Sequence, residues 1–126
     1  MNFKLNIKLS FIILIVVLFF SCTRNEKFDS KKWKESTKIF LSDERLKMVN
    51  DLISSRLLLG KSENEIIQQI GENSNYRLGI PEANPIKYFS VYDRYEWDID
   101  PVELIFLKIE FDNKGKSSKV ELFSKK

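Results

Sequence analysis

Hydrophobic residues follow three different patterns along the chain. They form an almost unbroken run at residues 9–20, recur at helical spacing between residues 43 and 70, and alternate with polar residues from residue 102 onward. A continuous run is typical of a segment that enters a membrane, a period of about 3.6 residues indicates an amphipathic helix, and alternation indicates a strand with one buried face. The chain therefore divides into an apolar leader, a helical part and a sheet part.

Two helices are expected in the helical part. The first spans residues 43–57, and Ser42 is a suitable N-cap for it. Its buried face carries Leu46, Val49, Ile53 and Leu57. The second helix follows Ser62, which forms with Glu65 the sequence signature of a capping box, and it ends at Gly71. Because a helix of about two turns is not stable alone, it must pack against the first helix and the sheet.

The last part of the chain predicts an antiparallel sheet. Residues 76–80 and 86–91 are expected to form short strands, the second of them irregular. The strand that follows residue 102 is better defined, and one of its faces carries Ile105, Leu107, Ile109 and Phe111. A turn at residues 112–116 leads into a return strand at residues 119–124. Two helices packed on a small antiparallel sheet of about three strands form a two-layer α+β domain.

The apolar run at residues 9–20 has the anatomy of a signal peptide. Lys4 and Lys8 precede it, and Ser21 supplies the small residue expected beside a cleavage point. The run is too short to span a bilayer, which needs about 20 apolar residues. We therefore expect residues 1–21 to be a leader that is removed on export.

The next segment, residues 22–41, is rich in charged side chains. It predicts a polar tether, which lets a folded domain at residues 42–126 stand away from a membrane. Four apolar residues near its end complicate this interpretation: Trp33, Ile39, Phe40 and Leu41. An apolar cluster at the end of a linker docks on the domain that follows, so we expect this part of the tether to be ordered.

Composition and charge exclude several classes of function. The net charge of the chain is +3, and loss of Lys4 and Lys8 with the leader reduces it to +1, so charge does not favour nucleic-acid binding. The chain has no histidine and one cysteine, which excludes Ser-His and Cys-His catalytic pairs and the usual zinc sites. Its four glycines are scattered and form no phosphate-binding loop. We expect no cofactor and no enzymatic activity.

The leader ends in Phe19-Phe20-Ser21-Cys22. This sequence resembles the lipobox of bacterial lipoproteins, in the looser form found in Bacteroidota and spirochaetes. The resemblance implies that the Cys22 thiol receives a diacylglyceryl group, that signal peptidase II cuts before Cys22, and that the new amino group is acylated. The alternative is an ordinary signal peptide and a free thiol, which is uncommon in an oxidising compartment. The resemblance implies a lipid-anchored envelope protein that faces the periplasm, on the outer rather than the inner membrane.

A second set of motifs runs through the domain, from about residue 45 to residue 123. It consists of Leu59-Gly60-Lys61-Ser62, Glu65-Ile66, Ile70-Gly71, Tyr76-Arg77-Leu78-Gly79 and Phe111-Asp112-Asn113-Lys114-Gly115-Lys116. In order and spacing this set resembles the BamE/SmpA/OmlA lipoproteins, in which a helix hairpin packs on a three-stranded antiparallel sheet. Asn73 stands where that family usually has proline, and the segment at residues 81–100 is long. The resemblance implies a role in outer-membrane or envelope assembly or maintenance.

Residues 88–100 have the most unusual composition of the chain. Their five aromatic residues are Tyr88, Phe89, Tyr92, Tyr95 and Trp97. If the segment is a partner-binding loop, these five are the expected anchors, because aromatic residues dominate protein interfaces. Alternatively, the aromatic residues cover the sheet and the four acidic residues between them face solvent. Acid–base catalysis would require Glu96, Asp98, Asp100 and Glu103 to converge with separated pKa values. A calcium loop would require further ligands and a glycine.

These observations favour a membrane-anchored, periplasm-facing lipoprotein that acts as a protein-interaction module. Its expected partners are the membrane, through acylated Cys22, and an envelope protein, with no role for nucleic acid. The alternative is a small inhibitor or sensor domain that binds a periplasmic enzyme or ligand.

Overall fold

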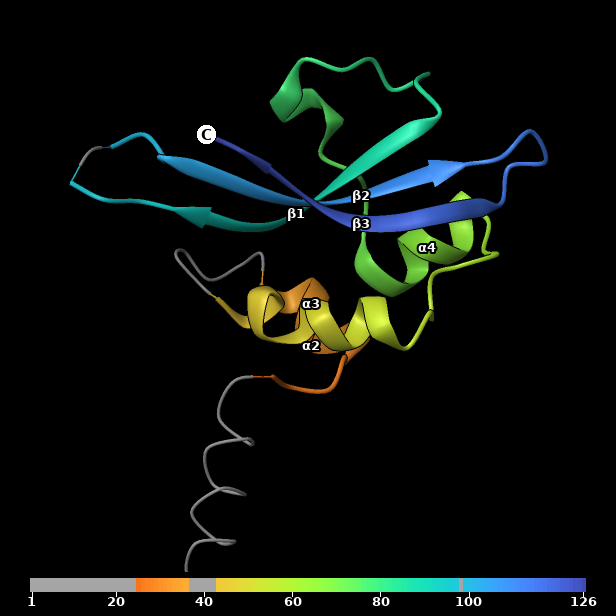
Figure 1. The fold of residues 1–126 in the computed structure, drawn as a ribbon, viewed down its shortest axis with the longest axis horizontal. Coiled ribbons are helices and arrows are strands. Elements are labelled where there is room, and N and C mark those ends of the chain that lie inside the picture. Colours follow the sequence, from red (N-terminus) through yellow and green to blue (C-terminus); the bar gives the residue numbers. More distant parts are fainter. Residues whose placement is uncertain (1–24, 37–42, 98) are drawn as a thin grey trace, which may run out of the picture.

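The computed structural model of the chain describes residues 25–36, 43–97 and 99–126. The helices are α2 (Ser30–Glu35), α3 (Glu44–Ser54), α4 (Glu63–Ile70) and the 3₁₀ helix η2 (Asn75–Leu78), and the strands are β1 (Ile86–Arg94), β2 (Glu103–Phe111) and β3 (Ser117–Lys125). The strands form an antiparallel meander in the order β1-β2-β3. Helices α2, α3 and α4 lie on one side of the sheet and η2 lies on the other (Figure 1). The α+β class with a three-stranded antiparallel sheet agrees with the sequence pattern.

The main core lies between the three helices and the sheet. Its buried residues are Trp33, Met48, Val49, Leu52, Leu58, Ile66, Ile70, Phe89, Val91, Leu107 and Ile109. The alternation in β2 predicted this face correctly, because Leu107 and Ile109 are buried in the core and Ile105 and Phe111 pack against it. The first strand and the helices supply the rest of the apolar surface that excludes water.

Helix α3 ends before the predicted boundary at residue 57. It stops at Ser54, because Arg56 adopts a left-handed backbone conformation with φ 58°. This break changes which leucine faces inward, so that Leu58 is 1% exposed and Leu57 is 38% exposed. The N-cap is Asp43; the predicted cap, Ser42, lies outside the described residues.

Helix α4 is formed as its sequence predicts. The Ser62 hydroxyl accepts a hydrogen bond from the backbone N–H of Glu65 at 3.3 Å, and the Glu65 carboxylate accepts one from the backbone N–H of Ser62 at 3.4 Å. These two bonds are the reciprocal contacts of a capping box. Gly71 ends the helix with φ 85°. The local sequence therefore determines both ends of this short helix.

Residues 25–36 pack on the rest of the domain, as expected for the segment that contains Trp33, although they precede the domain boundary predicted at residue 42. Trp33 in α2 is fully buried and packs edge-on against Phe28, with ring centroids 5.8 Å apart. The backbone N–H of Glu26 donates to the Lys47 carbonyl at 2.9 Å. The apolar surface that the two rings bury favours docking over a solvated linker. Ile39, Phe40 and Leu41 lie outside the described residues.

Residues 75–78 form η2, so the strand predicted at residues 76–80 is wrong. The side chain of Asn75 explains the difference, because it pairs with the edge of β1 as a neighbouring strand would. Its amide nitrogen donates to the Ile86 carbonyl at 3.0 Å, and its amide oxygen accepts from the Tyr88 N–H at 2.7 Å. Asn75 is completely buried. One side chain thus satisfies two backbone groups at an open sheet edge.

Replacing Asn75 by alanine is expected to lower the free energy of unfolding by about 2 kcal/mol, because it leaves the Ile86 carbonyl and the Tyr88 N–H without their partner. Urea denaturation followed by circular dichroism measures the change. Asn113→Ala, in the exposed β2–β3 turn, is the matched control and should change stability by less than about 0.5 kcal/mol. Equal midpoints for the two variants would show that the Asn75 contacts contribute nothing.

Candidate functional site

The β1–β2 hairpin projects beyond the helices at one end of the sheet (Figure 1). Its loop is closed by a hydrogen bond from the Val102 N–H to the Arg94 carbonyl at 2.8 Å. Trp97 is 100% exposed at its tip and Ile99 is 95% exposed. We call these two residues, with Glu96 and Asp100, the hairpin tip. A fully exposed tryptophan near an almost fully exposed isoleucine contributes nothing to the core of this domain.

The five predicted aromatic anchors occupy different environments. Phe89 is 1% exposed in the main core, so it is not a surface anchor. Tyr92 is half-buried and packs against the same core, and Tyr95 is also half-buried. Tyr88 packs on the opposite face of the sheet. Only Trp97 is freely accessible, and its apolar neighbour Ile99 was missed although it is an apolar residue placed between two aspartates.

The outer face of the sheet has a small apolar cluster of its own. The Tyr88 ring lies 6.3 Å from the Phe106 ring and 5.2 Å from the Phe123 ring, between centroids. The guanidinium of Arg77 lies over Phe106 at 5.7 Å from the ring centroid. It also makes two hydrogen bonds to the Asp93 carboxylate, at 2.7 and 3.1 Å. Phe106 is therefore fully buried although it lies on the face away from the helices.

The base of the hairpin is held by two ion pairs of Arg94, one of which joins its two strands. Arg94 contacts the Glu96 carboxylate at 2.9 Å and the Glu103 carboxylate at 3.3 Å. Glu103 also accepts a hydrogen bond from the Ser124 hydroxyl at 2.6 Å. The hydrogen bonds from Ser124 and Arg94 lower the pKa of Glu103 below its ordinary value. Glu103 is thus held ionised, whereas a general acid needs a raised pKa.

Strand β1 has a β-bulge, and a hydrogen bond from Arg45 of α3 joins the backbone beside it to the helix layer. Val91 is the extra residue of β1, between Ser90 and Tyr92. The Ser90 carbonyl accepts a hydrogen bond from the guanidinium of Arg45 at 2.6 Å, and a second nitrogen of Arg45 donates to the Trp33 carbonyl at 2.9 Å. Burial lowers the pKa of Arg45 to about 10, so the side chain remains charged at neutral pH. Arg45 thus holds the backbone of β1 beside the bulge, where a strand bends and twists.

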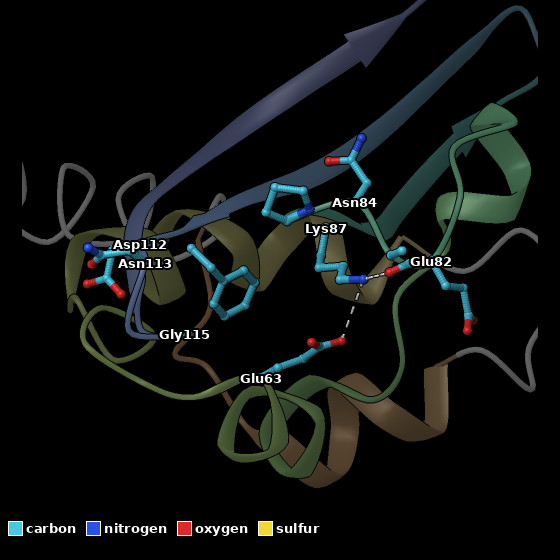
Figure 2. Close-up of a pocket in the computed structure, with 10 residues that line it drawn as sticks. Glu63, Glu82, Asn84, Lys87, Asp112, Asn113 and Gly115 are labelled. Carbon is cyan, nitrogen blue, oxygen red and sulfur yellow. Dashed lines mark hydrogen bonds and ion pairs between the residues drawn. The ribbon is translucent and has the colours of Figure 1, made fainter.

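A cleft of about 460 Å³ lies at the opposite end of the sheet (Figure 2). It is lined by Glu63, Glu82, Ala83, Asn84, Pro85, Lys87, Phe111, Asp112, Asn113 and Gly115. The ammonium of Lys87 points into it, donates to the Glu82 carbonyl and lies 4.0 Å from the Glu63 carboxylate. The Lys87 side chain is 8% exposed. This contact joins the first residue of α4 to the start of β1.

The chain was compared with protein-family models, curated proteins and solved structures, and no match was found. Within the described ranges, no helix is long and apolar enough to cross a membrane. The same residues contain no group of three His, Cys, Asp or Glu side chains placed to hold a metal ion. Cys22, Asp98 and the predicted leader at residues 1–21 lie outside the described residues.

Proposed function

We propose that this chain is a lipid-anchored, periplasm-facing lipoprotein of the cell envelope that acts as a protein-interaction module through its hairpin tip. The observation that carries this proposal is the exposure of Trp97 and Ile99. Large apolar side chains that lie close together and open to water are typical of binding surfaces. Tryptophan in particular is over-represented among the residues that dominate binding energy. The fold does not need either side chain, so a partner is the simplest reason for their position.

The proposed anchor is Cys22, and the sequence Phe19-Phe20-Ser21-Cys22 after an apolar run supports it. Several acyl chains on one residue give stable membrane attachment, whereas a single chain gives only reversible binding. The resemblance to the BamE/SmpA/OmlA lipoproteins supports a role in envelope assembly or maintenance and favours the outer membrane over the inner.

The anchor would hold the domain close to the bilayer. The backbone of Glu26 is bonded to α3, and four residues of extended chain, at about 3.5 Å each, allow at most about 14 Å between Cys22 and Glu26. With residues 25–36 packed in the domain, little free tether remains. The proposed partner is therefore a protein that is itself embedded in or attached to the same membrane, where anchoring raises the local concentration of both.

Intact mass spectrometry of the chain extracted from membranes tests the proposed anchor. We expect a polypeptide that begins at Cys22 and carries a diacylglyceryl group and an amide-linked acyl chain. The Cys22→Ala variant is expected to carry no lipid mass and to give no mature membrane-bound form, because the chain has no other cysteine to accept the diacylglyceryl group. A mature chain without lipid mass in the unmodified protein would contradict the proposal.

A further inference from the structure

The hairpin tip combines apolar and acidic surface. Trp97 and Ile99 are almost fully exposed, and the flanking residues Glu96 and Asp100 are exposed as well, with Glu96 in an ion pair with Arg94 at 2.9 Å. The sequence contains no lysine or arginine between residues 95 and 107. We infer that this tip inserts into an apolar pocket with a basic rim on an envelope protein. This inference rests on the proposed function and names the chemistry of its partner.

The acidic residues distinguish a protein pocket from a lipid surface. Side chains that insert into a bilayer beside tryptophan are accompanied by lysine or arginine, which bind anionic headgroups. The exposed carboxylate of Asp100 would instead meet repulsion from anionic lipid and a high cost of desolvation in the hydrocarbon. Lysine and arginine side chains around a pocket pair with such a carboxylate and steer the partner during association. Charge complementarity therefore favours a basic-rimmed protein pocket.

The hairpin is also held in place before binding. Arg94 of β1 pairs with Glu103 of β2 across the base of the loop and with Glu96 within the loop. Arg77 holds Asp93 near the end of β1 through two hydrogen bonds. Fixing the stem in advance reduces the conformational entropy that binding removes. The tip is thus a preformed binding element, in which the exposed apolar residues Trp97 and Ile99 stand beside the exposed carboxylate of Asp100.

Thiol accessibility at the tip tests the inference in the full lipidated chain. In an Ile99→Cys variant the new thiol is the only free one, because Cys22 is acylated in the proposed mature form. Its rate of reaction with a water-soluble maleimide is compared in native envelope membranes and in vesicles of the lipids extracted from those membranes. Tyr76→Cys, at a residue that is 78% exposed outside the tip, is the matched control and should react rapidly in both.

We expect the thiol introduced at position 99 to react about tenfold more slowly in native membranes than in lipid vesicles. This factor corresponds to a partner that leaves about one tenth of the tips unoccupied. Adding Asp100→Lys should restore fast reaction, whereas Glu82→Lys, an exposed charge reversal outside the tip, should not. Salt at about 1 M, where the Debye length is about 3 Å, should also speed the reaction.

Three results would overturn the inference. Slow reaction in lipid vesicles would mean that the tip contacts lipid, and fast reaction in both preparations would mean that it docks nowhere. Slow reaction in native membranes that neither Asp100→Lys nor salt relieves would exclude a basic rim. Failure of the proposed anchor is recognised separately, because the unlipidated chain would not carry acyl mass and would not sediment with membranes.

Discussion

Replacing Trp33 by alanine is expected to lower the free energy of unfolding by about 3–5 kcal/mol, the range for deleting a buried aromatic side chain. Trp33 is fully buried, contacts Phe28 edge-on, and lies under the guanidinium of Arg45 at 5.2 Å from its centroid. A small domain has about 5–15 kcal/mol of stability in total, so this one change removes a large share of it. Urea denaturation measures the loss.

Two further variants make this result specific. Trp33→Phe is expected to be much milder than Trp33→Ala, because the indole N–H finds no hydrogen-bond partner among the described residues and packing is its main contribution. Trp97→Ala, at the fully exposed tryptophan, should leave the unfolding midpoint unchanged. An unchanged midpoint for Trp33→Ala would mean that residues 25–36 are a tether after all.

Replacing Arg45 by alanine is expected to cost about 3 kcal/mol, because the acceptors that it serves lose a charged donor in a buried position. Its guanidinium donates to the Trp33 carbonyl and the Ser36 hydroxyl, each at 2.9 Å, and to the Ser90 carbonyl at 2.6 Å. These contacts join α2, α3 and the bulge of β1. Lys47→Ala, on the same helix but half-exposed, is the control and should cost less than about 0.5 kcal/mol.

The Arg45 variant has a second expected effect, on the backbone mobility of β1 at the bulge. Loss of the bond to the Ser90 carbonyl frees the backbone at the bulge, so amide hydrogen exchange should rise in β1 around residues 90–92 more than in β3. Equal protection of β1 in both proteins, together with an unchanged unfolding midpoint, would show that Arg45 does not hold the bulge.

Local signals in the sequence were sufficient for α4 and for the β2–β3 hairpin. The capping box of Ser62 and Glu65 and the positive φ of Gly71 and Gly115 need only neighbouring residues, and all of them are found. The end of α3 was not predictable in this way, because the left-handed conformation of Arg56 has no sequence signature. The pattern at residues 76–80 was misleading, since the preceding Asn75 pairs with a strand that begins more than ten residues later.

The exposure of the five aromatic residues could be predicted only in part, and one physical reason lies in the bulge. Alternation assigns Phe89 and Val91 to one face of β1 and Tyr88 and Tyr92 to the other. The extra residue at Val91 shifts this phase, so that Val91 and Tyr92 both pack toward the helices. Composition alone therefore could not tell the exposed aromatic residue, Trp97, from those that cover the sheet.

The central claim is that the hairpin tip of an anchored protein contacts a defined envelope partner. Photocrosslinking in intact cells, from a photoreactive residue at position 97 of the full chain, tests this claim most directly. Position 76 is the matched control, because Tyr76 is also exposed but lies outside the tip. We expect one defined protein adduct from position 97 and none from position 76. No adduct from position 97, or the same adducts from both positions, would contradict the claim.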